Sequence, residues 1–376
     1  MSTGTGPGEP RRHHPQRIAV LPGDGIGKDV TAEVVKVLEA AGETWSLPLE
    51  LVPFAWDADR YLATGETLPP GSLEDFRDNY AAIFIGAYGD PRVPDMKHAA
   101  DILLGIRFGL DLYINLRPVK LYDPRFCPLK PARERGDRAG ERKIDMVIFR
   151  ENTEGAYVNL GGNFKRGTAD EIAVQEEIHT RKGVERILRA AFDYAEANGR
   201  REVLMSDKSN VMRYGHDLWQ RCFHEIAAEY PQIASRHMFV DALAMQMVLH
   251  PENFDVIVTN NMFGDIITDL GAALQGGLGL AASANLHPGR TSMFEPVHGS
   301  APKYAGSGRA NPVGAVLSAA LMLETLGHGE AAKAVENAVA QALREGQVTP
   351  DLGGSLTTSE VGDLLARSLG RAVAAR

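Results

Sequence analysis

The chain has 376 residues, of which 44% are hydrophobic and 24% are charged, a composition typical of a globular protein with enough apolar side chains for a large core. Its length predicts two or three domains, or one elaborated α/β unit. Aspartate and glutamate total 49 against 40 lysines and arginines, which gives a formal net charge of −9. This balance argues against a general nucleic-acid-binding protein, because such a protein needs a positive surface to displace phosphate counterions.

The two cysteines, Cys127 and Cys222, are too few for a disulfide framework or a thiolate metal cluster, and we expect both as small buried apolar residues. No apolar run approaches the ~18 residues that a membrane span requires. Residues 1–17 contain Gly, Pro and charged residues but no hydrophobic segment, so they predict a short disordered leader and not a secretory signal. We therefore expect a cytoplasmic protein that binds neither a membrane nor nucleic acid.

The first predicted element is a strand at residues 18–21, which ends in a Gly-rich turn and leads into a helix with apolar residues at helical spacing between residues 30 and 38. Further apolar runs predict strands at residues 49–54, 81–86, 143–149, 202–205, 237–240 and 255–259. Periodicity and spacing predict helices at residues 183–198, 216–229, from about residue 265, 313–326 and 331–343. Strands that alternate with helices are typical of an α/β fold with a largely parallel sheet.

Two segments depart from this alternation. Residues 151–177 are polar and Gly-rich, and their polarity alternates at residues 172–178, which predicts an antiparallel hairpin that could serve as an arm toward a partner subunit. Residues 123–142 are rich in proline and charge, and they predict a surface loop.

A Gly-rich turn at residues 23–28 (Gly-Asp-Gly-Ile-Gly-Lys) lies between the first strand and the first helix, where a phosphate cradle would stand. The dinucleotide fingerprint Gly-x-Gly-x-x-Gly is not met, because the third glycine comes one residue early and position 28 is lysine. The turn alone therefore leaves two interpretations open, a nucleotide contact or a tight structural turn.

Three arginines, Arg107, Arg117 and Arg150, each lie within an apolar segment. A guanidinium group is costly to bury beside such segments without an anionic partner, and its planar donors suit a carboxylate. The alternative for each arginine is an internal salt bridge.

Asp265 and Asp269 are four residues apart, which places both carboxylates on one face of a helix. Two such charges repel each other unless a cation lies between them, and hard oxygen ligands suit Mg²⁺ or Mn²⁺. Asp241 is a candidate third ligand. The alternative is that Asp265 caps the helix while Asp269 faces solvent.

Two further features could carry chemistry. Tyr157 and Lys208 are side chains that donate or accept protons when their surroundings shift their pKa, although each type is more often a surface or packing residue. Residues 295–304 (Glu-Pro-Val-His-Gly-Ser-Ala-Pro-Lys-Tyr) predict a rigid loop with free backbone donors, suited either to a turn or to a ligand cradle.

Taken together, the motifs resemble those of the β-decarboxylating dehydrogenase family, which includes 3-isopropylmalate, isocitrate, homoisocitrate and tartrate dehydrogenases. The similarity covers nearly the whole chain after Gln16, and the motifs that carry it are, in order, LPGDGIG, INLRPVK, RENTEG-Y, DKSN, VDALAMQMV, TNNMFGDIITDL and EPVHGSAP. The resemblance implies a two-domain α/β fold of the isopropylmalate/isocitrate dehydrogenase type, distinct from the Rossmann fold.

The resemblance also implies how the chain is divided. Residues 18–112 and 276–376 would form a discontinuous cofactor-binding domain, and residues 113–275 a substrate and dimerisation domain. Residues 151–177 would be an intersubunit β-arm of a homodimer with shared active sites.

Site roles follow from the resemblance residue by residue. Substrate carboxylates would be held by Arg107, Arg117 and Arg150. Metal ligands would be Asp265 and Asp269, together with Asp241 from the neighbouring subunit, where it would also border the substrate. Protons would be handled by Tyr157 and Lys208, the latter across the dimer. The cofactor would contact Ile26, Glu295, His298, Gly299, Ser300, Ala301, Pro302, Lys303, Tyr304 and Asn311.

The activity implied by the resemblance is oxidative decarboxylation of a 3-substituted malate, dependent on NAD or NADP and on Mg²⁺ or Mn²⁺. Asp101 and Leu103 stand where the isocitrate branch has serine and asparagine. An anionic Asp101 would repel a third substrate carboxylate, while Leu103 and Leu104 would accept an alkyl group, so the first expectation is 3-isopropylmalate.

Alternatives remain for substrate and cofactor. RENTEG resembles the tartrate and isocitrate branches, so tartrate, homoisocitrate, isocitrate or a phosphonomethyl malate stay open, as does a non-catalytic metabolite-binding protein. Lys303-Tyr304 resembles NADP-using isocitrate dehydrogenases, since NAD-using relatives generally carry aspartate at the first position. The supporting Tyr and Arg expected further on are replaced by Pro350 and Gly354, so both cofactors are retained.

Overall fold

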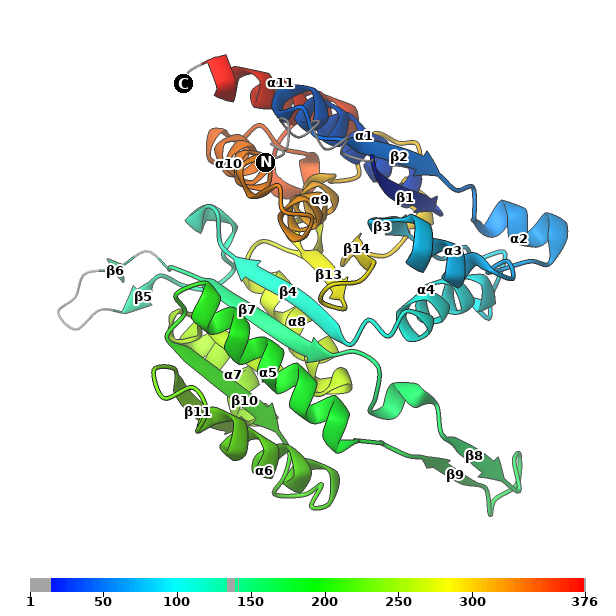
Figure 1. The fold of residues 1–376 in the computed structure, drawn as a ribbon, viewed down its shortest axis with the longest axis vertical. Helices are drawn as coiled ribbons and strands as arrows, with labels where there is room; N and C mark the ends of the chain where they lie inside the picture. Colours follow the sequence, from blue (N-terminus) through cyan, green and yellow to red (C-terminus); the bar gives the residue numbers. More distant parts are fainter. Residues whose placement is uncertain (1–14, 134–138, 141, 375–376) are drawn as a thin grey trace, which may run out of the picture.

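One mixed sheet of ten strands organises the computed structural model, which describes residues 15–133, 139–140 and 142–374 (Figure 1). The strand order is β11-β10-β12-β7-β4-β13-β14-β3-β1-β2. The strands are β1 (Gln16–Gly23), β2 (Leu49–Pro53), β3 (Ala82–Ala87), β4 (Ile114–Lys120), β7 (Asp145–Glu151), β10 (Glu202–Asp207), β11 (Ala234–Phe239), β12 (Val256–Thr259), β13 (Ala282–Leu286) and β14 (Ser292–Pro296).

The sheet has two halves that meet in its middle. Strands β4, β7, β12, β10 and β11 come from residues 113–275, and β13, β14, β3, β1 and β2 come from the rest of the chain. The pairs β7–β4, β4–β13 and β13–β14 are antiparallel, whereas the outer pairs are parallel. The predicted α/β class with a largely parallel sheet is therefore confirmed.

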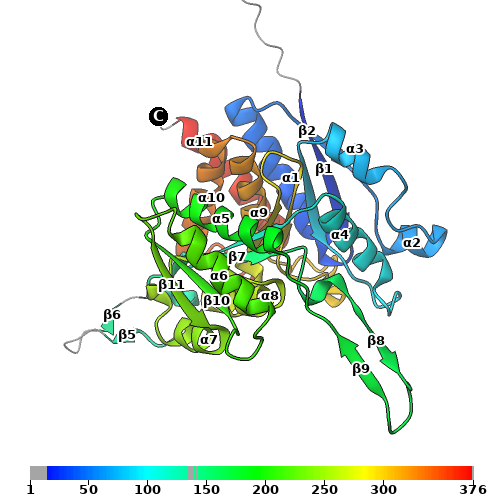
Figure 2. The ribbon, with the colours of Figure 1, turned by 60° about the horizontal axis from the view of Figure 1, so that its bottom comes forward.

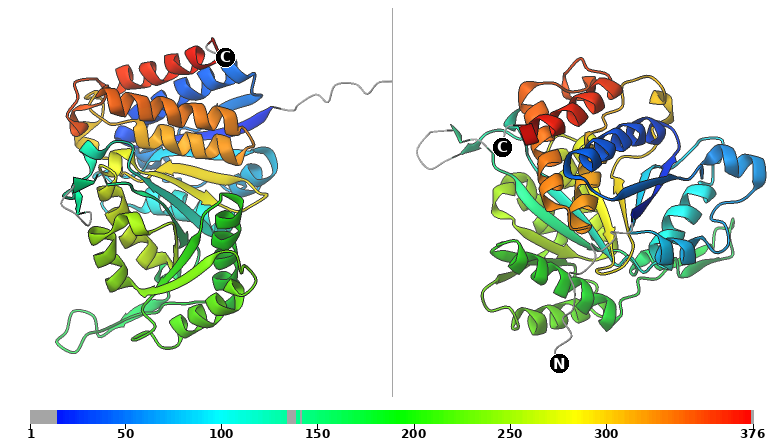
Figure 3. Two further views of the ribbon diagram at one scale, coloured as in Figure 1. Left: turned by 90° about the vertical axis from the view of Figure 1, so that its left-hand side faces the viewer. Right: turned by 45° about the horizontal axis from the view of Figure 1, so that its top comes forward.

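Helices cover both faces of this sheet because its strands are apolar on both sides. On β7, Val147 and Phe149 belong to the core cluster beneath α5, while Met146 and Ile148 belong to the cluster beneath α8. In Figure 3 the C-terminal helices α9, α10 and α11 lie beside α1, and α11 packs directly on α1. The helices are α1 (Ile26–Trp45), α2 (Ala58–Thr64), α3 (Ser72–Asn79), α4 (Lys97–Gly109), α5 (Arg181–Ala197), α6 (Gly215–Ala227), α7 (Val240–Leu249), α8 (Asn261–Leu274), α9 (Val313–Thr325), α10 (Gly329–Glu345) and α11 (Thr358–Ala374).

A two-stranded hairpin projects from the body, as the sequence predicts (Figure 2). It consists of β8 (Gly161–Phe164) and β9 (Ile172–Gln175), which pair antiparallel. Every residue of both strands is exposed, and Phe164 is 62% exposed. Apolar side chains on so thin an element have no core of their own to cover them.

Three boundaries differ from the predictions. The predicted leader extends two residues too far, because Gln16 and Arg17 belong to β1: the Gln16 amide donates to the Pro48 carbonyl at 2.6 Å. Residues 1–14 lie outside the described part. Helix α8 begins at Asn261 and not near residue 265. The loop at residues 123–142 contains a short 3₁₀ helix and the pair β5 (Ala132–Arg133) and β6 (Ala139–Gly140), while residues 134–138 and 141 are not described.

The apolar patterns in the sequence did not predict several elements, namely α2, α3, α4, α7, β4, β13 and β14. Both cysteines are free: Cys222 is fully buried, as expected, and Cys127 is partly buried. In the described part of the chain, no helix combines the length and apolar character needed to cross a bilayer.

Candidate active site

Arg150 lies near the end of β7 and points at helix α8. It is 2% exposed, its Nε donates to Asn261 Oδ1 at 3.0 Å, and a terminal nitrogen bonds Asp265 Oδ1. Gly264 makes room for it, since a Cβ there would lie 2.5 Å from the Arg150 side chain. The Tyr157 hydroxyl donates to the other oxygen of Asp265 at 3.1 Å. A buried cation, a carboxylate and a phenol therefore meet at one point.

Arg117 reaches the same helix from the neighbouring strand β4. Its guanidinium donates to Thr268 Oγ1 at 2.7 Å and lies 3.9 Å from Asp265 and 3.7 Å from Asp269. Burial, together with the nearby charge of Arg150, lowers the pKa of Arg117 to about 10. Its Nε has no hydrogen-bond partner. Arg117 thus keeps a buried N–H donor to which a bound anion could supply the acceptor.

Arg107 comes to this site from α4. Burial lowers its pKa and the charge of Arg150 adds to that shift, while the carboxylates of Glu295 and Asp265 oppose it. Its Nε is also buried without a partner. The structure therefore brings all three predicted arginines together beside α8.

Asp265 and Asp269 face outward from α8 on the side that the arginines approach. The alternative in which Asp265 caps the helix is wrong, because the Asn260 side chain accepts the bond from the Phe263 amide at 2.8 Å. The aspartate side chains are 46% and 64% exposed. Two accessible hard oxygen donors one helical turn apart fit Mg²⁺ or Mn²⁺ with further ligands from substrate and water.

Lys208 and Asp241 form a separate pair in this chain. Lys208 Nζ donates to Asp241 at 2.7 Å, and this bond lowers the pKa of the aspartate, whose side chain is 69% exposed. Within the described residues, no hydrogen bond or ion pair joins either side chain to Asp265 or Asp269. Within one described chain, this pair is therefore not bonded to the aspartates of α8.

Exposed apolar side chains lie on the elements that follow this second pair in the chain and on helix α8 beside them. Tyr214, which follows Lys208 in a loop, is 95% exposed, and helices α7 and α8 lie side by side. We call this surface the α7–α8 patch; it comprises Val211, Tyr214, Met245, Val248, Leu249 and Ile266. So many exposed apolar side chains in one region are typical of a protein–protein contact.

The Gly-rich turn packs against the loop at residues 298–302. Gly25 has a φ of +54°, and a Cβ there would lie 2.1 Å from the Ser300 carbonyl oxygen, which accepts the Ile26 amide at 2.8 Å. His298 has a pKa lowered by burial, and its Nε2 is buried without a partner. The glycines thus serve a tight turn, and the turn and loop leave one ring nitrogen free for a ligand such as an adenine.

Two cations flank the ring of Tyr304 beyond this loop. Lys303 Nζ lies 4.8 Å and the Arg309 guanidinium 5.9 Å from the ring centre. The sequence analysis missed Arg309, although a cation six residues after Lys303 was a visible signal. Asn311 is occupied by a bond from its amide to Asp351 at 3.0 Å. The loop therefore presents a local positive charge despite the negative chain.

Glu295 takes a place closer to the arginines than to this loop. It lies on β14, accepts a bond from Asn285 at 2.8 Å, and acts electrostatically on Arg107 and Arg117. It thus links the loop segment to the anion-binding site.

Leu103 and Leu104 lie on α4 one helical turn before Arg107, and both are partly buried. Asp101 does not present a bare charge, because it accepts bonds from Lys97 at 2.6 Å and Thr67 at 3.0 Å, and the bond from Lys97 lowers its pKa. The expectation that Asp101 repels a substrate carboxylate is therefore weakened, and the leucines are left as the main candidates for selectivity.

Asn261 is a further residue that the sequence analysis missed. Its amide oxygen accepts from Arg150 and its nitrogen donates to the Glu154 carbonyl at 3.0 Å. The sequence signal that could have identified it is the Asn-Asn pair at the start of a predicted helix.

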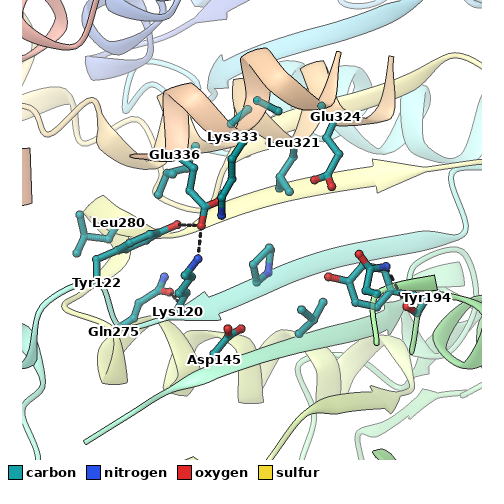
Figure 4. A pocket seen from close by; sticks show the side chains of 18 of the residues that line it. Lys120, Tyr122, Asp145, Tyr194, Gln275, Leu280, Leu321, Glu324, Lys333 and Glu336 are labelled. Atoms are coloured by element: carbon teal, nitrogen blue, oxygen red, sulfur yellow. Dashed lines mark hydrogen bonds and ion pairs between the residues drawn. The ribbon is translucent and has the colours of Figure 1, made fainter. Parts of the chain in front are cut away.

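A cavity of about 350 Å³ lies elsewhere, between β4 and β7 on one side and α9 and α10 on the other (Figure 4). Lys120 forms an ion pair with Glu336 in it, and the Tyr122 hydroxyl lies 3.3 Å from the same carboxylate. None of the predicted site residues lines this cavity.

Comparison with known proteins agrees with this geometry. The family model for isocitrate/isopropylmalate dehydrogenase matches residues 17–365. A 3-isopropylmalate dehydrogenase of Thermobifida fusca is 45% identical over 93% of this chain and 97% of its own length. A tartrate dehydrogenase/decarboxylase of Pseudomonas putida is 44% identical over 95% and 99%. A crystal structure of isocitrate dehydrogenase from Methylococcus capsulatus superposes with a TM-score of 0.83 at 34% identity, covering 94% of this chain and 99% of that one. The non-catalytic alternative is set aside, and the chain belongs to the isocitrate/isopropylmalate dehydrogenase family of decarboxylating oxidoreductases.

Proposed function

We propose that the protein oxidises and decarboxylates a 3-substituted malate, with 3-isopropylmalate as the substrate and NAD or NADP as the hydride acceptor. The observation that carries this proposal is the convergence of Arg107, Arg117 and Arg150 on the α8 aspartates, with two arginine Nε groups left without partners. A dicarboxylate supplies acceptors for these free donors.

The side chains present divide the chemistry among them. The arginines would bind and orient the two carboxylates, and Lys208 would accept or relay the proton of the 2-hydroxyl. A bound NAD or NADP would supply the hydride acceptor. Tyr157 then gives a proton to the enol carbon after CO₂ departs. A divalent ion held by Asp265 and Asp269 supplies Lewis-acid stabilisation of the negative charge on the substrate oxygens.

We further propose that the active protein is a homodimer in which each subunit lends Lys208 and Asp241 to its partner's site. The pair is not bonded to the α8 aspartates of its own chain, and α7, which begins next to Asp241, carries exposed residues of the α7–α8 patch. Burial of that patch against a second copy would complete two equivalent sites. The exposed hairpin arm is the second contact that we assign to this dimer.

The substrate assignment rests on Leu103 and Leu104, which offer an apolar wall one turn before Arg107. Several relatives of about 45% identity are named 3-isopropylmalate dehydrogenase. Tartrate is the second candidate, favoured by the RENTEG motif and by the relative named tartrate dehydrogenase/decarboxylase.

A panel of 3-substituted malates tests this assignment, with cofactor reduction and CO₂ release both followed. Wild-type protein is expected to prefer 3-isopropylmalate, and Leu104→Gln is expected to lower kcat/KM for it by ~10–100-fold, because a polar group replaces apolar contact with the alkyl substituent. Tartrate turnover should change little. Leu62→Gln, at a leucine that is 50% exposed on α2, is the matched control. Equal losses of kcat/KM for both substrates would contradict a role of Leu104 in substrate selectivity.

Cofactor choice is assigned to the loop that carries Lys303. Its charge, together with that of Arg309 near the same Tyr304 ring, favours a cofactor with a 2′-phosphate. Lys303→Asp is expected to raise the NAD-over-NADP ratio of kcat/KM by ~10-fold or more, because the carboxylate repels that phosphate. Binding of NADH and NADPH measured by fluorescence should shift in the same direction. Lys182→Asp on α5 is the control, and an unchanged ratio in Lys303→Asp contradicts the assignment.

A further inference from the structure

A buried polar cluster stands apart from the arginines at the base of the hairpin arm. We call it the arm-root cluster, and it comprises Glu177, His179, His216 and Asn260. Glu177 Oε1 lies 3.1 Å from His179 Nε2 and accepts from Asn260 Nδ2 at 2.9 Å, while its Oε2 lies 3.6 Å from His216 Nε2. The two histidine side chains are 3% and 0% exposed. One carboxylate is thus enclosed by three nitrogen groups.

The hydrogen bonds on the far side of each ring fix its tautomer. The Trp219 indole N–H donates to His179 Nδ1 at 3.2 Å, and the backbone N–H of Lys208 donates to His216 Nδ1 at 2.7 Å. Each Nδ1 therefore carries a lone pair, and the proton of each neutral ring must be on Nε2. The two imidazole rings beside Glu177 outweigh the opposing effect of burial and lower its pKa to about 2. Nε2 of His216 also lies 3.2 Å from the Asn260 side-chain nitrogen.

The same reasoning excludes a metal ion here, although the three side chains are close enough to hold one. A neutral histidine that binds a metal through Nε2 must carry its proton on Nδ1 and donate it outward. Both Nδ1 atoms instead accept hydrogen bonds. The cluster is consequently a set of fixed donors around one carboxylate.

Three functional segments are tied to this cluster. His216 holds the backbone of Lys208, and Asn260 caps α8, the helix that carries Asp265. Ile178, which lies between Glu177 and His179 in the chain, pairs with Gly155, two residues before Tyr157. A shift of Glu177 would therefore move the lysine, the aspartate helix and the tyrosine segment together.

We infer that His216 is a positioning residue for Lys208: its Nδ1 accepts the backbone N–H of the lysine, and its fully buried ring is held beside Asn260 and Glu177. The inference rests on the proposed role of Lys208 in proton transfer. A ring that is buried and bonded in this way sets the direction in which the lysine side chain leaves the end of β10, and misplacement by about 1 Å is enough to slow catalysis ~100-fold.

Two polar substitutions separate the two bonds of this ring. His216→Asn keeps an acceptor at the position of Nδ1, whereas His216→Gln keeps a polar group only at the position of Nε2. We expect His216→Asn to keep most of the wild-type kcat, and His216→Gln to lower kcat by ~10–100-fold with little change in KM. His224→Leu, at an exposed histidine on the same helix, is the matched control.

Repeating both substitutions in a Lys208→Ala background distinguishes positioning from a general loss of structure. If His216 acts through Lys208, neither substitution lowers the residual kcat further, because coupled residues are not additive. Equal kcat in the two single variants, or a further loss in the Lys208→Ala background, overturns the inference. Full activity of Lys208→Ala alone would instead show that the proposed role of Lys208 is wrong. Thermal unfolding of each variant confirms that it is folded.

Discussion

Arg117→Met is expected to lower kcat/KM for the malate substrate by ~30- to several-thousand-fold, while the melting temperature stays the same or rises. Loss of activity follows because a substrate carboxylate loses a buried cationic partner. Stability should not suffer, since burial and the neighbouring Arg150 already disfavour this charge and hold its pKa near 10, below its usual 12.5. At neutral pH the folded state therefore bears the full free-energy cost of keeping Arg117 charged, on the order of 3 kcal/mol. This cost would lessen only as the pH rises past 10, where the folded state begins to lose the proton.

Steady-state kinetics and thermal unfolding of the same preparation check this result. Arg189→Met is the control, because Arg189 lies on the surface of α5 in a two-point ion pair with Glu229, and it should change neither quantity appreciably. A fall in melting temperature of Arg117→Met by several degrees, in parallel with the activity, would favour the alternative of an internal salt bridge to Asp265 and Asp269.

Mixing two inactive variants, Lys208→Ala and Asp265→Asn, is expected to restore about a quarter of the wild-type activity. Each variant alone should lose ~100- to 10,000-fold in kcat, because one lacks the proton acceptor and the other a metal-binding carboxylate. If each site takes Lys208 from one subunit and Asp265 from the other, a mixed dimer has one site with both defects and one intact site. Half of the dimers are mixed after random exchange, which gives the expected fraction.

A second mixture serves as the control. Asp265 and Arg117 belong to the same part of one chain, where they lie 3.9 Å apart. Mixed dimers of Asp265→Asn and Arg117→Met therefore have one defect in each site and should stay inactive. Activity is measured after the subunits have been dissociated and reassociated, with wild-type protein carried through the same treatment. No recovery in the first mixture, or equal recovery in both, would contradict the shared site.

The sequence predicted those parts of the fold that obey simple periodicity. Alternating and helical apolar patterns predicted β1, β7 and α5. The four-residue spacing correctly placed Asp265 and Asp269 on one helix, although the predicted start of α8 was wrong. The start was missed because Asn260, an ordinary N-cap residue, lies five positions before Asp265, the first residue that drew attention.

Other parts depend on partners that are distant in the chain. Strands β4 and β13 carry Asn115 and Asn285, residues typical of turns, and they are buried because the two side chains bond each other at 3.1 Å. Asp101 likewise resembled a free anion in the sequence, because its hydrogen bond from the distant Thr67 forms only in the folded chain. The tautomers of the two arm-root histidines, too, follow only from donors that come from two separate segments.

The position of β14 has a consequence for synthesis of the chain. This strand, residues 292–296, lies between β13 and β3, and α11 at the C-terminal end packs on α1 at the start. While the ribosome makes residues 113–275, β3 therefore has an unpaired edge and α1 an uncovered face, although the strands of the middle segment can already pair with one another. The half of the sheet that is translated first is completed last, and a chaperone that shields an open strand edge would act on this protein during that interval.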